Sequence, residues 1–120
     1  MNPKQECKKL INSFKYAIEG FISSFKTERN MKIHILAMVL VIVLGLYLKL
    51  NLIEWCFITF AIALVIGSEL FNTAIETIVD MVSPEKNPKA KLAKDISAAA
   101  VLALAIGSAV IGAIIFIPKI

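Results

Sequence analysis

The chain has 120 residues, 58% of them hydrophobic, and its mean hydropathy is +0.79. A soluble domain is roughly 45–50% apolar, so this composition excludes an ordinary soluble fold and predicts that lipid covers part of the surface. The formal net charge is +4, and eleven of the thirteen basic residues lie in two clusters (4–32 and 86–94) that adjoin apolar stretches, which favours contact with anionic lipid over nucleic-acid binding.

Residues 1–28 are predicted to form an amphipathic helix on the membrane surface. Its lysines lie mainly outside an apolar stripe, a pattern typical of a helix in the plane of the bilayer surface. An ordinary helix packed on a partner is the alternative. The apolar side chains that recur at helical spacing are Leu10, Ile11, Phe14, Ala17, Ile18, Phe21, Ile22 and Phe25.

Two transmembrane helices are predicted next, over residues 29–49 and 52–82. The apolar part of the first, Ile33–Leu48, is shorter than the ~20 residues that a bilayer requires, and Lys32 can extend it by placing its ammonium group at the interface. The segment Ser83–Pro88 contains two prolines and ends the second helix.

Residues 90–118 are predicted to form the third transmembrane helix, which carries no charge over the 23 residues of Ile96–Pro118. Eleven basic residues lie on one side of the predicted membrane spans, and two, Lys49 and Lys119, lie on the other. By the positive-inside rule, this distribution predicts that the N-terminus is in the cytoplasm. The length predicts a single domain, 1–120, and an all-α membrane protein.

Small residues spaced four apart on the third helix, such as Ala105 with Ala109 and Ser108 with Gly112, allow close helix packing in lipid. Three helices offer little interior for charged groups. An oligomer of identical chains is therefore expected.

Four polar residues share one face of the second predicted span: Glu69, Asn72, Glu76 and Asp80. Ionisable groups at membrane depth are costly and usually face a protein interior or a wet cavity. Carboxylates suit Mg²⁺, which takes one or two of them together with substrate phosphates, and a partly buried carboxylate can act as a general base. Glu69, the deeper residue, is the candidate base, and Glu76 is the candidate metal ligand.

Glu28, Lys94 and Asp95 are expected at the same cytoplasmic level, where Lys94 could bind phosphate. Simpler alternatives remain open: Glu28 can form a solvated pair with Arg29, and Asp95 can be the N-cap of the third span. His34 is expected only to cap or line the first span. The sequence contains no glycine-rich phosphate loop, protein-kinase signature or zinc-ligand pattern.

Two blocks of the sequence resemble the prokaryotic diacylglycerol kinase family. Residues 69–76 followed by Val79 and Asp80 resemble its signature, and residues 93–95 with 98–102 resemble its second conserved block. The leader, with Tyr16, Gly20 and Glu28, matches as well, so the resemblance spans essentially the whole chain. Residues 28–34, the two-proline loop and residues 115–119 are similar to the Gram-positive undecaprenol kinase branch of the family.

The resemblance implies a homotrimer in the cell membrane, with active sites shared between subunits, that transfers phosphate from ATP to a lipid alcohol with the help of Mg²⁺. It implies that Glu69 is the general base for the lipid hydroxyl and that Glu28 and Glu76 bind the metal. Lys9 stands where related enzymes often have arginine, and lysine lacks the fork that binds phosphate bidentately. The residues implied around the nucleotide and the reacting centre are Tyr16, Glu28, Asn72, Glu76, Asp80, Glu85, Asn87, Lys94 and Asp95.

The first hypothesis for the function is therefore ATP-dependent phosphorylation of undecaprenol, with diacylglycerol as the alternative acceptor. A different class of function is a small oligomeric ion or proton pathway lined by Glu69, Glu76 and Asp80. The placement of Asn72 and Lys94 favours the kinase, because a simple pore needs neither. A purely structural membrane subunit leaves the carboxylate stripe unexplained.

Overall fold

The computed structural model describes all 120 residues, and every regular element in it is helical. The order is α1 (Pro3–Thr27), α2 (Arg29–Tyr47), α3 (Leu52–Val82) and α4 (Pro88–Phe116), followed by a short 3-10 turn, η1 (Ile117–Lys119). Helices α2, α3 and α4 with its continuation into η1 are each long and apolar enough to cross a membrane. The prediction of an all-helical chain with three long apolar helices is confirmed.

Asparagine caps determine where α1 and α3 begin. The side chain of Asn2 accepts from the backbone N–H of Gln5 at 2.8 Å, and that of Asn51 accepts from Glu54 at 2.9 Å. In both cases the third helical residue reaches back to the N-cap N–H, which completes a capping box. These reciprocal bonds satisfy amide groups that have no partner inside the helix.

The cap of α4 differs from the sequence alternative. Asn87 caps this helix by accepting from the backbone N–H of Lys89 at 2.8 Å, and Pro88 is the first helical residue. The interpretation of Asp95 as the N-cap is therefore wrong: Asp95 lies inside α4 and pairs with Lys91, one turn earlier, at 2.6 Å.

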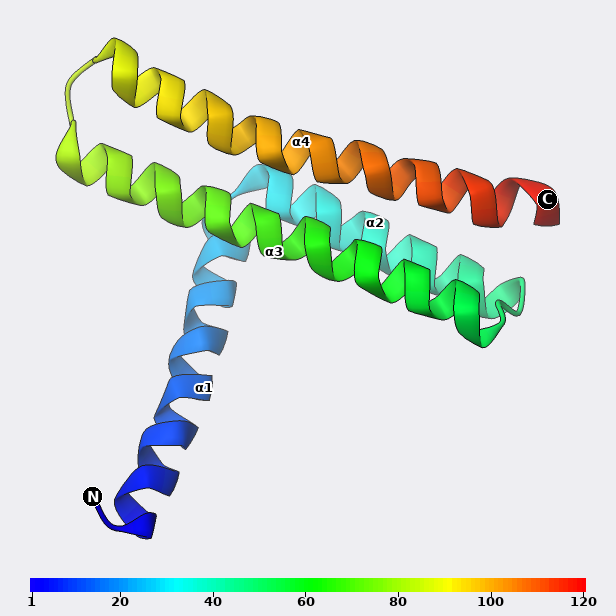
Figure 1. Cartoon of the computed structure of the whole chain (residues 1–120), viewed down its shortest axis with the longest axis horizontal. Helices are drawn as coiled ribbons and strands as arrows, with labels where there is room; N and C mark the ends of the chain where they lie inside the picture. The colour runs from blue at the N-terminus through cyan, green and yellow to red at the C-terminus, as the bar shows by residue number, and fades with distance from the viewer.

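Helices α2, α3 and α4 run alongside one another (Figure 1). Helix α3 packs against both α2 and α4, whereas α2 and α4 do not contact each other along their backbones. Helix α1 leaves the bundle near Glu28 and points away from it, so that only its C-terminal end touches α2 and α3. At this junction Ser24 and Thr73 share a hydrogen bond of 3.2 Å, and Met31 is fully buried.

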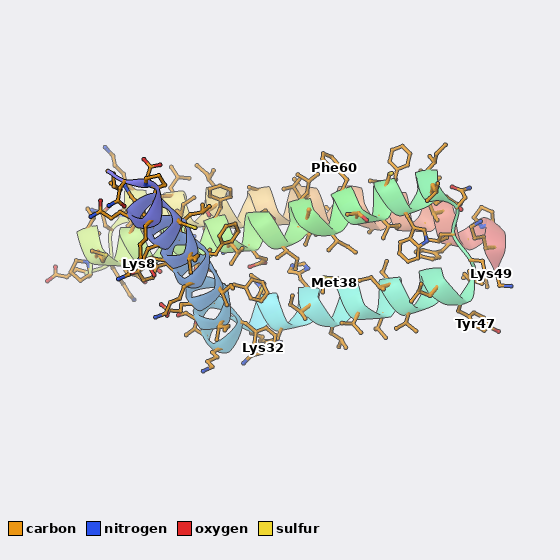
Figure 2. The ribbon with its side chains drawn as sticks, turned by 90° about the horizontal axis from the view of Figure 1, so that it is seen from below. Lys8, Lys32, Met38, Tyr47, Lys49 and Phe60 are labelled. Atoms are coloured by element: carbon orange, nitrogen blue, oxygen red, sulfur yellow. The ribbon has the colours of Figure 1, made fainter.

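The end of the bundle opposite α1 holds a small core of Leu50, Ile58, Ile115 and Phe116. Trp55 packs beside it and approaches Gly45 so closely that a Cβ atom there would lie 2.8 Å from the indole ring. Only 13 of the 120 residues are buried. Large apolar side chains such as Phe60 point away from the helices (Figure 2), as expected for a chain covered by lipid and partners.

Candidate active site

Glu69 is the most deeply buried charged residue of the chain, with 1% of its surface exposed. It lies on α3 opposite α2, where His34 places Nε2 3.3 Å from the Glu69 carboxylate oxygen Oε1. From the sequence, His34 is expected only to cap or line the first span. Its contact with Glu69 depends on how α2 packs against α3, and no local pattern around a single histidine reports that packing.

Asn72 and Glu76 follow Glu69 along α3 toward the α3–α4 loop. The Asn72 side-chain amide donates to Glu76 Oε1 at 3.1 Å, while the buried Asn72 carbonyl oxygen, Oδ1, has no partner. A buried polar atom without a partner is uncommon in folded proteins. This oxygen is therefore free to bind a cation or to accept from a donor supplied by a ligand.

A polar cavity of about 800 Å³ lies at the α3–α4 loop. Lys94 pairs with Asp80 at its edge, and further lysines make the lining suited to phosphate groups. Four residues expected around the nucleotide meet here. Among the lining residues are Asp80, Glu85, Lys86, Asn87, Lys91 and Lys94.

Three other expected residues are placed differently. Tyr16 is 64% exposed in the part of α1 that points away from the bundle, so the chain does not bring it to Glu69. Asp95 is exposed on α4, paired with Lys91. Glu28 is the residue between α1 and α2, and it forms no ion pair with Arg29.

No three histidine, cysteine, aspartate or glutamate side chains converge on one point in the chain. Mg²⁺ in phosphoryl-transfer sites usually has one or two protein carboxylates and takes its remaining ligands from water and substrate phosphates. Glu28 and Glu76 have carboxylates, which are hard oxygen donors, and the oxygen of Asn72 beside Glu76 has no partner. This donor set fits an ion that arrives with a nucleotide.

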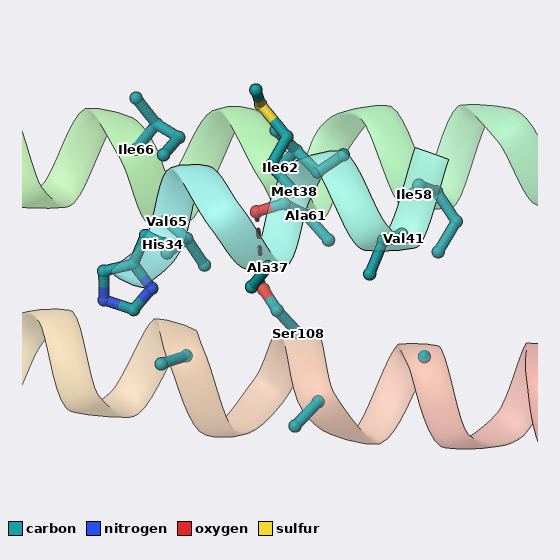
Figure 3. Close-up of a pocket in the computed structure, with 13 residues that line it drawn as sticks. His34, Ala37, Met38, Val41, Ile58, Ala61, Ile62, Val65, Ile66 and Ser108 are labelled. Carbon is teal, nitrogen blue, oxygen red and sulfur yellow. Dashed lines mark hydrogen bonds between the residues drawn. The ribbon is translucent and has the colours of Figure 1, made fainter. Parts of the chain in front are cut away.

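A second cavity, of about 330 Å³, lies between α2, α3 and α4 (Figure 3). His34 and Ser108 contribute its only polar side chains, and the Ser108 hydroxyl is occupied as a donor to the Ala61 carbonyl at 3.4 Å. His34 lies at one end of the cavity, and Val41 and Ile58 lie toward the other. The surroundings of Glu69 are thus polar toward the α3–α4 loop and apolar in the opposite direction.

Known proteins resemble the chain over nearly its full length. Residues 15–116 match the family described as prokaryotic diacylglycerol kinase. The chain is 38% identical over 117 residues to the undecaprenol kinase of Bacillus subtilis (strain 168), a match that covers 98% of this chain and 95% of that protein.

Two diacylglycerol kinases are similar to a comparable degree. The protein from Synechocystis sp. is 37% identical over 120 residues, covering 99% of this chain and 69% of its own length. The protein from Haemophilus influenzae is 36% identical over 108 residues, covering 89% and 92%. Every polar residue of the site described above lies inside the matched region.

Proposed function

The chain belongs to the prokaryotic diacylglycerol kinase family, and from this premise we propose that it phosphorylates undecaprenol with ATP and Mg²⁺. Membership makes it a multi-pass membrane enzyme that transfers phosphate to a lipid alcohol. The observation that carries the proposal is the buried carboxylate of Glu69, paired with His34 and situated between an apolar cavity and a lysine-lined polar cavity.

Glu69 is the general base of the proposed reaction. Its carboxylate takes the proton of the lipid hydroxyl, the lipid oxygen forms a bond to the γ-phosphorus of ATP, and the bond from that phosphorus to the bridging oxygen breaks to release ADP. His34 holds the carboxylate from the side of α2 at 3.3 Å. A base on a rigid helix, fixed by a second helix, meets the requirement that phosphoryl transfer be mainly a matter of positioning and charge.

Glu28 and Glu76 are the residues that would hold Mg²⁺, with Asn72 Oδ1 as a further oxygen donor. When bound, the ion offsets charge on the phosphate oxygens. Asn72 already fixes one oxygen of Glu76 by donating to it at 3.1 Å. That bond leaves the second Glu76 oxygen free for a ligand.

Lys94 is the proposed cation for the phosphates of the nucleotide, and the 800 Å³ cavity beside it is the proposed nucleotide site, with Glu85 and Asn87 on its lining. Tyr16 and Asp95 do not reach this cavity within one chain. We therefore propose a homotrimer in which subunits share active sites. In it, α1 lies on the cytoplasmic surface of the cell membrane, with the N-terminus inside.

Undecaprenol is proposed as the acceptor because the match to the Bacillus subtilis undecaprenol kinase covers 95% of that protein and because residues 28–34 are similar to that branch. Diacylglycerol is the second candidate, favoured by the two relatives that carry the name diacylglycerol kinase. Either acceptor uses the same base and the same direction of transfer.

The test is phosphate transfer from labelled ATP with Mg²⁺ to undecaprenol and to diacylglycerol, measured side by side on purified protein in lipid-containing micelles. Preference for undecaprenol supports the proposal, and preference for diacylglycerol overturns the acceptor but keeps the mechanism. Transfer to neither lipid by folded protein overturns both. Glu69→Gln serves as the control: it should abolish turnover and leave the fold and subunit assembly intact, and near-normal activity would exclude Glu69 as the base.

A further inference from the structure

The apolar cavity adjoins Glu69 on the side away from the α3–α4 loop. Val65 and Ile58, which line it, precede Glu69 by four and eleven residues, and these offsets correspond to about 6 and 16 Å along the helix axis. His34 both lines the cavity and contacts the Glu69 carboxylate. The cavity thus begins beside the proposed base and extends about 10 Å further toward the far end of the bundle.

The volume and lining of the cavity favour a small apolar group. Its α4 wall consists of small residues, Ala105, Ser108, Ala109 and Gly112, and its other walls are mostly aliphatic. The volume of about 330 Å³ is roughly twice that of an engineered cavity of ~150 Å³ that holds one benzene molecule. It therefore has room for about two units of five carbons, and it offers no free hydrogen-bonding group except the imidazole of His34.

We propose that this cavity holds the first isoprene units of a polyprenol acceptor, with the chain entering from the bilayer and the hydroxyl presented to Glu69 at the His34 end. The inference rests on the proposed function and adds the binding site of the lipid chain. The entry route runs between α2 and α4, which pack on α3 but not on each other, past the exposed residues Ala37 and Ala109.

The limited volume of the cavity matches the start of a single chain. A polyprenol carries one methyl-branched hydrocarbon chain, whereas diacylglycerol carries two chains that diverge from one head group. At most one of those two chains can enter the cavity. The cavity thus favours the acceptor with one chain, the same acceptor that the proposed function names.

The proposed contribution of the cavity is to orient the bound lipid chain. Lipid tails are as apolar as the cavity walls, so moving the chain out of the bilayer gains little hydrophobic free energy. What the cavity provides is a fixed path that places the hydroxyl against the base, and small misplacements of a reacting group can cost up to about 100-fold in rate. Blocking the cavity should therefore lower kcat/KM for the lipid and leave the use of ATP unchanged.

Two glycines on α4 offer a matched pair of variants. Gly112 lines the cavity at its far end and Gly107 does not, and a Cβ atom at either position meets no atom within 4 Å. Gly112→Phe puts a ring of benzene size into the cavity and fills about half of it. Gly107→Phe adds the same ring to the same helix outside the cavity.

We expect Gly112→Phe to lower kcat/KM for undecaprenol by about tenfold or more, and Gly107→Phe to match the unsubstituted enzyme. A prenol of one isoprene unit, which needs only the half of the cavity at the His34 end, should be phosphorylated by both variants at nearly the unsubstituted rate. At the other end of the cavity, Ala105→Leu should impair both prenols, because every chain must pass it, and Ala103→Leu, outside the cavity, should impair neither.

Unchanged kcat/KM for undecaprenol in Gly112→Phe would overturn the inference. So would an equal loss on both prenols in that variant, because the ring would then act on the fold or the chemistry rather than on the chain. A changed subunit number in Gly112→Phe, measured by cross-linking, would show that a second copy of the chain fills the cavity and would also overturn it. If the unsubstituted enzyme phosphorylated none of the lipid alcohols, that result would instead overturn the proposed function on which the inference rests.

Discussion

His34 is the residue through which the structure makes its sharpest prediction about catalysis. Its Nε2 atom is the polar side-chain group next to the buried Glu69 carboxylate, at 3.3 Å. His34→Leu removes that group but keeps an apolar side chain on the cavity wall, while His34→Gln can still donate from its side-chain amide. The two variants therefore separate the loss of the polar contact from the loss of packing.

The expected size of the effect follows from the kind of contact. A hydrogen bond to a charged group contributes about 1.5–3 kcal/mol, and each 1.36 kcal/mol corresponds to tenfold in rate. His34 and Glu69 lie at ion-pair distance, 3.3 Å, without the geometry of a hydrogen bond, so this range is an upper bound. His34→Leu should lower kcat by at most about 160-fold, with little change in KM for ATP, because the histidine does not line the polar cavity. His34→Gln should recover a large part of the lost rate.

Steady-state transfer from labelled ATP to undecaprenol is the assay, and a double-mutant cycle is its control. Glu69→Asp retains a carboxylate but shortens the side chain and breaks the contact with His34. Adding His34→Leu to Glu69→Asp should therefore cost little further activity. A full-sized loss in that background, or a kcat for His34→Leu close to that of the unsubstituted enzyme, would refute the argument that His34 acts by holding Glu69.

Three further predictions test other parts of the structure. Glu76→Gln should raise the Mg²⁺ concentration needed for half-maximal activity, since a neutral amide binds the ion more weakly; an unchanged Mg²⁺ titration would count against the metal role. Lys94→Met should raise KM for ATP and lower kcat, whereas Lys89→Met, on the same helix but outside the polar cavity, should change neither; equal behaviour of the two would argue against a phosphate contact at Lys94. Gly45→Ala should destabilise the fold by about 1–3 kcal/mol through overpacking, because the new Cβ would lie 2.8 Å from the ring of Trp55, and a thermal melt in detergent equal to that of the unsubstituted protein would contradict this packing.

The helices were predictable because their signals are local. Apolar stretches, prolines and charge-free runs fixed the number and type of the long helices, and those patterns do not depend on tertiary contacts. The start of α4 was harder to predict because Asn87 and Asp95 are both good capping residues. Asn87 is the residue that caps the helix, because Pro88, directly after it, is favoured at the first helical position. The side-chain oxygen of Asn87 accepts from the backbone N–H of Lys89.

The candidate site was only partly predictable, because some of its contacts join residues that are far apart in the sequence. Glu69, Asn72 and Glu76 could be grouped from their spacing on one helix. The contact between His34 and Glu69 joins residues 35 apart, and it depends on the rotation of α2 against α3, which the sequence pattern does not specify. The place of Tyr16 depends on what lies beside α1, and nothing within a single chain covers most of that helix.

The arrangement along α3 also bears on how a kinase of this family can limit the transfer of phosphate from ATP to water. Glu69 is 1% exposed, and an apolar cavity lies on one side of it. The cavity has two polar side chains: Ser108, whose hydroxyl donates to the Ala61 carbonyl, and His34. The burial of Glu69 limits the access of water to its carboxylate. In the proposed mechanism the lipid hydroxyl approaches Glu69 along the apolar cavity and the nucleotide occupies the polar cavity at the loop. Because the two substrates then approach the buried carboxylate from opposite directions, an acceptor that carries an apolar chain is favoured over water on the side of the apolar cavity.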